Sequence, residues 1–94
     1  DGIIPRVGSL DDCFRIRPGG EIVLDWPEVT LSITSSPELG HLQVYTPKGS
    51  VCVEPQTSCV NAFALHERGI ANTGFATASP VAPFAATTRW AWSA

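Results

Sequence analysis

Residues His41–Thr57 read HLQVYTPKGSVCVEPQT, and this stretch decides the fold. Two runs of alternating character, His41–Thr46 and Val51–Glu54, flank four turn-forming residues, Pro47-Lys48-Gly49-Ser50. Such a pattern predicts a β-hairpin with a four-residue loop. If Thr46 lies opposite Val51, the strands pair Tyr45 with Cys52, Val44 with Val53 and Gln43 with Glu54.

The predicted hairpin has one apolar and one polar face, because successive side chains in a strand point to opposite sides. The apolar face carries Leu42, Val44, Thr46, Val51 and Val53, and the polar face carries His41, Gln43, Tyr45, Cys52 and Glu54. Glu54 is the one carboxylate on the polar face. Pro55 follows it and restricts its backbone to extended conformations, which sets the direction of the carboxylate.

The rest of the chain predicts further short strands separated by Pro- and Gly-rich turns. We expect strands at Cys13–Ile16, Glu21–Asp25, Val29–Thr34 and Phe84–Ser93, an irregular strand at Ile70–Thr77 and a short helical turn within Ser58–Leu65. No long segment has a helical period. The pattern therefore predicts an all-β fold, an antiparallel β-sandwich.

Length and composition limit the function classes. The chain has 94 residues, which suits one domain, 1–94, with a small core. Only 16% of its residues are charged, so we expect part of its surface to rest against other protein. The chain contains no Met and begins at Asp1, which predicts an incomplete unit, a piece of a longer reading frame or a processed product.

Net charge, apolar run length and cysteine spacing argue against a nucleic-acid-binding protein, a membrane-spanning protein and a secreted protein held by disulfides. The net charge of −3 with six Lys and Arg residues provides no basic patch for nucleic acid. No apolar run is long enough to cross a membrane. The three cysteines have neither paired nor metal-ligand spacing, so we expect reduced thiols, a cytoplasmic protein and no cysteine-bound metal.

Several side chains are candidates for chemistry, each with a plainer alternative. Glu54 is either a general base, its pKa raised by burial in a polar cleft, or a solvated glutamate at a strand end. Asp11 and its neighbour Asp12 either bind sugar hydroxyls or serve a turn. His41 is a hydrogen-bond donor or a structural histidine, and Trp90 with Trp92 forms a sugar-stacking face or part of the core.

Three motifs resemble the C-terminal part of the aldose 1-epimerases, also called galactose mutarotases. They are LQVYTP (Leu42–Pro47), VCVEPQT (Val51–Thr57) with Asn61-Ala62-Phe63, and SLDDCF (Ser9–Phe14). The Pro-rich segment before TTRWAW also fits, so the resemblance runs from Ser9 to Trp92, and VEPQT is its most specific part. It implies a galactose-mutarotase-like supersandwich, of which this chain would be the C-terminal portion.

The resemblance also implies a reaction, the interconversion of the α and β anomers of a free hexose such as galactose or glucose. It places the catalytic base on Glu54 and a contact with sugar hydroxyls on Asp11, and it requires no cofactor. The family's acid, a histidine well upstream, has no counterpart here, so the upstream portion of the same protein would supply it. The alternatives are a non-catalytic carbohydrate-binding β-module and a β-domain in which Glu54 is structural.

Overall fold

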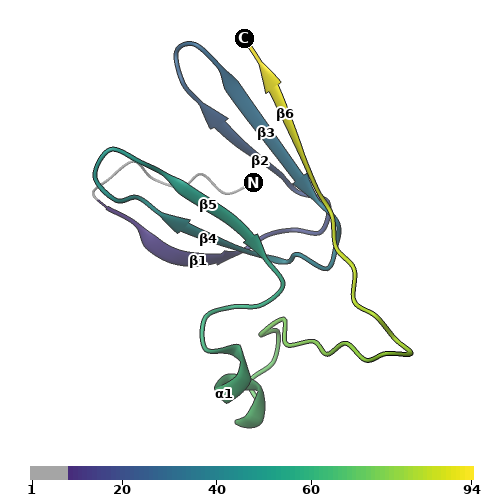
Figure 1. Cartoon of the computed structure of the whole chain (residues 1–94). Helices are drawn as coiled ribbons and strands as arrows, with labels where there is room; N and C mark the ends of the chain where they lie inside the picture. Colours follow the sequence, from purple (N-terminus) through teal and green to yellow (C-terminus); the bar gives the residue numbers. More distant parts are fainter. Residues whose placement is uncertain (1–8) are drawn as a thin grey trace.

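The structure, a computed structural model, describes residues 9–94 and consists of two antiparallel three-stranded sheets and one short helix (Figure 1). The elements are β1 (Asp11–Arg15), β2 (Glu21–Asp25), β3 (Thr30–Ser35), β4 (His41–Tyr45), β5 (Cys52–Gln56), α1 (Ala62–Glu67) and β6 (Thr88–Ser93). One sheet has the order β1-β4-β5 and the other β2-β3-β6. The predicted all-β antiparallel sandwich is confirmed.

The hairpin of β4 and β5 has the predicted register. Tyr45 pairs with Cys52, Val44 with Val53 and Gln43 with Glu54. The turn is closed by a hydrogen bond from the Ser50 amide to the Pro47 carbonyl oxygen, 3.1 Å long. The strand β1 lies on the other side of β4, so the hairpin forms two thirds of its sheet.

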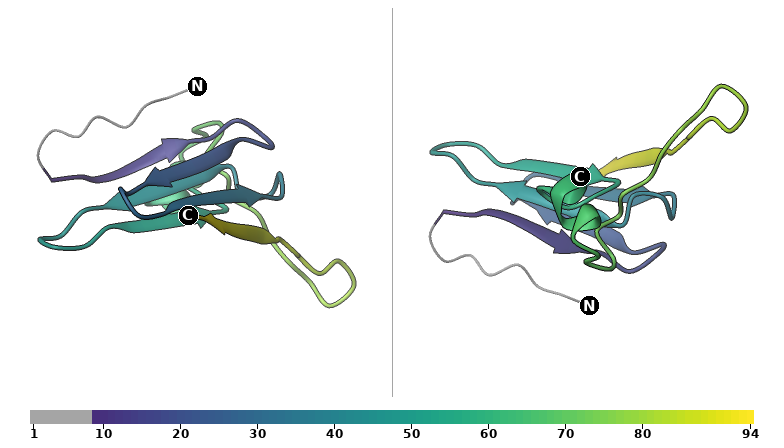
Figure 2. Two further views of the ribbon diagram at one scale, coloured as in Figure 1. Left: turned by 90° about the horizontal axis from the view of Figure 1, so that it is seen from above. Right: turned by 90° about the horizontal axis from the view of Figure 1, so that it is seen from below.

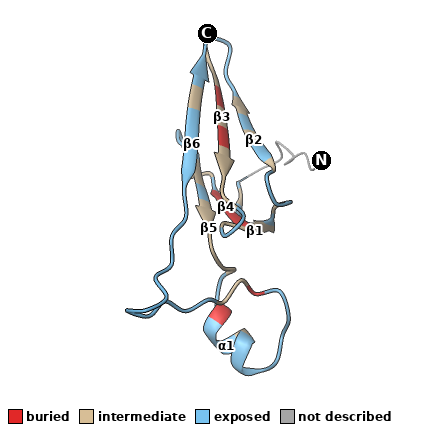
Figure 3. Ribbon diagram, turned by 90° about the vertical axis from the view of Figure 1, so that its right-hand side faces the viewer, coloured by how far each residue is buried: buried red, intermediate tan, exposed pale blue. Residues whose placement is uncertain are grey.

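The core lies between the central strands of the two sheets, where Figure 3 shows the buried segments of β3 and β4. Leu31 and Ile33 point inward from β3, and Leu42 and Val44 point inward from β4, each at most 3% exposed. These residues are the apolar members of two alternating runs, so the period of two observed in the sequence directly specifies the core.

The last strand joins its sheet across a long sequence separation. After α1 the chain runs away from the sheets and returns as β6, which pairs with β3 (Figure 2). Two backbone-anchored hydrogen bonds fix the entry: the Ser36 amide donates to the Thr87 carbonyl oxygen, and the Thr87 amide donates to Ser36 Oγ, each 2.9 Å long.

Several predicted boundaries are wrong. Residues 70–77 contain no strand, because Asn72 and Gly74 have positive φ angles (62° and 78°) that interrupt extended backbone. The helix is Ala62–Glu67, which begins and ends later than the predicted helical turn within Ser58–Leu65. The last strand, β6, begins at Thr88 and not at the predicted Phe84, since residues 84–87 are irregular. Residues 1–8 of the predicted unit lie outside the described residues.

Within residues 9–94, the single helix is far too short to cross a bilayer.

Candidate functional site

The outer face of the sheet β1-β4-β5 is polar and combines residues from both ends of the predicted site. Residues directly opposite one another in paired strands share a face. The register therefore gives three rows across the sheet: Asp11, Tyr45 and Cys52; Cys13, Gln43 and Glu54; Arg15, His41 and Gln56. The two residues predicted to act on a sugar, Asp11 and Glu54, thus lie on the same face.

Gln43 connects these two acids. Its Nε2 donates a 2.8 Å hydrogen bond to Asp11 Oδ1, and its Cα lies opposite that of Glu54. Asp11 and Glu54 are two strand spacings and one same-face step apart, which puts their Cα atoms roughly 12 Å from each other. A ligand that spans the two carboxylates would therefore lie over Gln43. The hairpin prediction had placed Gln43 on this face without a role.

Glu54 is exposed, so the burial expected for a general base is not found within the described chain. The reason is that β5 is an edge strand and no described segment lies over the polar face at that point. Pro55 occupies the following position of β5, where its missing N–H faces the free edge, because the pair Leu42 and Pro55 does not exchange ladder hydrogen bonds. The backbone of Glu54 is extended, and the surroundings of its carboxylate are open.

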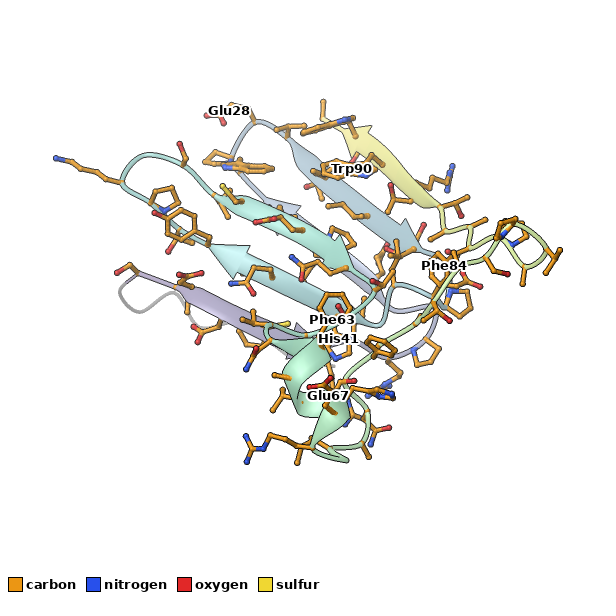
Figure 4. All side chains as sticks on the ribbon, turned by 60° about the horizontal axis from the view of Figure 1, so that its bottom comes forward. Glu28, His41, Phe63, Glu67, Phe84 and Trp90 are labelled. Carbon is orange, nitrogen blue, oxygen red and sulfur yellow. The ribbon has the colours of Figure 1, made fainter. Side chains whose placement is uncertain are left out.

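His41 occupies the protected end of the same face and is only 6% exposed. The loop that follows α1 covers it: a Cβ built on Gly74 would lie 3.0 Å from His41 Cε1, so the glycine lets the backbone approach the ring. Figure 4 shows His41 at this end, near α1. The predicted structural histidine agrees with this burial. In the sequence, Gly74 was the residue that could have indicated this contact, but it was included in the predicted strand Ile70–Thr77.

Two polar atoms on this face have no hydrogen-bond partner among the described residues: His41 Nδ1 and Gln43 Oε1. Both atoms are buried, and the loop at Gly74 lies against the His41 ring. Each unpaired buried polar group lowers the stability of the fold by about 1–3 kcal/mol. Because two such groups lie here, this face has hydrogen-bonding capacity that the described residues do not use.

The other candidates lie apart from this face. Trp90 and Trp92 point toward the space between the sheets, where they pair with Ile33 and Leu31. They are nevertheless 49% and 61% exposed, so they face the core as one interpretation predicted but are not buried in it. His66 is part of α1 and stacks on Phe75 with ring centroids 4.2 Å apart.

Neither of the two best-formed hollows in the described structure includes Asp11 or Glu54. One, of about 440 Å³, is formed by His66 and residues 69–75, and the other, of about 210 Å³, opens between the sheets beside the tryptophans. Among residues 9–94 no three His, Cys, Asp or Glu side chains gather as metal ligands. The polar face is thus an open surface whose chemistry is that of carboxylate, carboxamide and phenol groups.

Comparison of the chain with protein-family models, with curated proteins and with solved structures finds no match.

Proposed function

We propose that this chain is the C-terminal portion of an aldose 1-epimerase with a galactose-mutarotase-like supersandwich fold. The observation that supports the proposal is the row of polar side chains from Asp11 through Gln43 to Glu54, on one face of a sheet. These residues come from the motifs that resemble the family, which are far apart in the sequence and adjacent in the fold. An open face without a pocket agrees with a site that further protein completes.

In the proposed reaction Glu54 removes the proton from the anomeric hydroxyl of a hexose while an acid protonates the ring oxygen. The bond between C1 and the ring oxygen breaks and leaves a free aldehyde. Rotation about C1–C2 followed by reclosure, with both protons returned, gives the other anomer. Asp11, held by Gln43, accepts hydrogen bonds from sugar hydroxyls, and the reaction needs no metal or cofactor.

The acid comes from the upstream portion of the protein, in this proposal. His41 does not supply it, because the loop at Gly74 covers the ring and leaves Nδ1 buried. A cytoplasmic location fits the three free cysteines, Cys13, Cys52 and Cys59, none of which is paired.

The test is mutarotation of freshly dissolved galactose, followed by polarimetry with the complete protein and its Glu54→Gln variant. Removal of a general base lowers a rate by about 10²–10⁴-fold, so we expect a loss in that range. Glu28→Gln, an exposed glutamate in the turn after β2, is the control and should keep the full rate. A Glu54→Gln protein that retains near-normal rate would remove Glu54 from the role of base.

A non-catalytic carbohydrate-binding module is the second candidate, and the exposed environment of Glu54 favours it. Tyr45, 44% exposed and next to Asp11 in the first row, offers an aromatic surface for a sugar ring beside a carboxylate. Calorimetry with galactose and glucose distinguishes the two functions. Binding that depends on Asp11, without any rate enhancement by the complete protein, supports the module.

A further inference from the structure

The strand β6 is an edge strand that carries two large apolar side chains and a single charged residue, Arg89. The two described sheets have four edge strands, β1, β5, β2 and β6, and the first three are more strongly protected than β6. Charged residues occupy three of the five positions of β1 and both ends of β2, and β5 has Pro55 at a position where its N–H would face outward. Charges and proline are the devices by which proteins prevent edge-to-edge pairing.

The free backbone groups of β6 can be assigned to particular residues. The Ser36 amide bonds to the Thr87 carbonyl oxygen, so this pair is of the hydrogen-bonded type, and the type alternates along an antiparallel ladder. Arg89, Ala91 and Ser93 therefore bond to β3. The N–H and C=O groups of Trp90 and Trp92 point away from it, where no described strand meets them.

The apolar side of this edge is open as well. Trp90 and Trp92 lie on the side of β6 that faces the other sheet, and the cleft of about 210 Å³ next to them is lined only by apolar residues. Figure 4 shows Trp90 on this strand, far from the end of the molecule that holds His41 and α1. Unpaired backbone along the rim of an apolar cleft fits an added β-strand with inward apolar side chains.

We propose that β6 pairs antiparallel with β6 of a second copy of this chain, forming a two-fold symmetric dimer with a continuous six-stranded sheet. Centred on Ala91, the pairing is self-complementary. Trp90 of each copy lies opposite Trp92 of the other, so the outward backbone groups bond to one another and the indoles form cross-strand aromatic pairs. Arg89 lies opposite Ser93, so no like charges oppose each other.

The exposed area limits the strength of this dimer. At about 250 Å² for a whole tryptophan, the exposed fractions of 49% and 61% provide roughly 270 Å² of indole surface per copy. That is below the roughly 800 Å² per partner of a standard stable interface, so the dimer should be weak, with a Kd on the order of 10–100 µM.

Sedimentation velocity from about 1 to about 200 µM tests the dimer, and amide exchange tests where it forms. We expect a shift from monomer to dimer with concentration. Over the same range the Trp90 and Trp92 amides should become protected by about three- to sixfold, the factor by which the fraction of free monomer falls for such a Kd, while the Ala91 amide, already bonded to β3, should change little. These exchange measurements use the unmodified chain and do not depend on the folding of any variant.

Two matched variants complete the test. Trp92→Lys puts a charge into the paired edge and should leave the protein monomeric throughout the range. Trp26→Lys alters a tryptophan of similar exposure, 40%, that lines the cleft from outside β6, and it should still dimerise. A chain that stays monomeric up to about 200 µM overturns the proposal. The β6 edge would then either have no partner or pair with a different polypeptide. A dimer that leaves the Trp90 and Trp92 amides unprotected also overturns it.

Discussion

Replacement of Gly74 by alanine should destabilise the protein far more than the same change at Gly69. Both glycines have a φ of 78°, so alanine meets the same backbone strain of about 1–2 kcal/mol at each position. The space around them differs. A Cβ on Gly69 meets no atom within 4 Å, whereas one on Gly74 would overlap the Thr57 carbonyl oxygen and lie 2.8 Å from Ser58 Cα.

The overlap at Gly74 is with backbone, so it can be relieved only by moving the loop off the sheet. Forcing extra atoms into a packed site costs about 1–3 kcal/mol, which brings Gly74→Ala to about 2–5 kcal/mol in total. In a domain of this size 1 kcal/mol corresponds to about 4–8 °C in Tm. We therefore expect a Tm lower by at least about 8 °C for Gly74→Ala, and for Gly69→Ala a loss about half as large as the one measured for Gly74→Ala.

Thermal unfolding followed by circular dichroism measures both variants, and chemical denaturation gives the free energy of unfolding. The His41 ring provides a second readout, because the loop at Gly74 covers it. In the Gly74→Ala protein its NMR signals should move toward those of a solvated imidazole, and in Gly69→Ala they should not. Equal losses of stability in the two variants would refute the packing of this loop on His41.

Three further expectations follow from the sheets. Ile33→Ala removes a side chain that is 0% exposed and should cost about 2–5 kcal/mol by chemical denaturation, against less than about 1 kcal/mol for Val23→Ala on the outer face at 51% exposure. Gln43→Ala removes the 2.8 Å hydrogen bond that holds Asp11. If the chain binds galactose as proposed, the affinity measured by calorimetry should fall by about fivefold in this variant, and an unchanged affinity would argue against that contact. Tyr45 is the single tyrosine, so its ring NMR signals should shift on addition of galactose if the sugar lies on this face, and a ring that does not respond at saturating sugar would exclude it.

The sequence predicted local pairing better than distant pairing. The register of Gln43 with Glu54 followed from alternation and loop length, because both strands belong to one hairpin. The pairing of β1 with β4 and of β3 with β6 depends on which distant strands meet edge to edge, and no local pattern encodes that. Consequently the sequence showed the polar character of Glu54's face, but it did not show that Asp11 joins that face or that Gln43 lies between them.

The errors have equally physical causes. Residues 70–77 look like a strand because their side chains suit one, but Gly74 is required for its positive φ and its missing Cβ, and those properties serve a loop that packs on His41. Trp90 and Trp92 have the alternation of core residues. Their side of the sheet is the inner one, but there they line an open cleft with Val53 of the opposite sheet and stay about half exposed.

The entry of β6 through Ser36 and Thr87 has a consequence for the order in which the molecule folds. The hairpin of β4 and β5 closes a loop of a few residues, an event on the microsecond scale, whereas Thr87 must find a partner 51 residues away. The second sheet should therefore acquire its last strand late, after β2 and β3 have paired. In stopped-flow experiments, variants at Ser36 should speed unfolding and leave the folding rate nearly unchanged, the behaviour of a contact that is absent from the transition state.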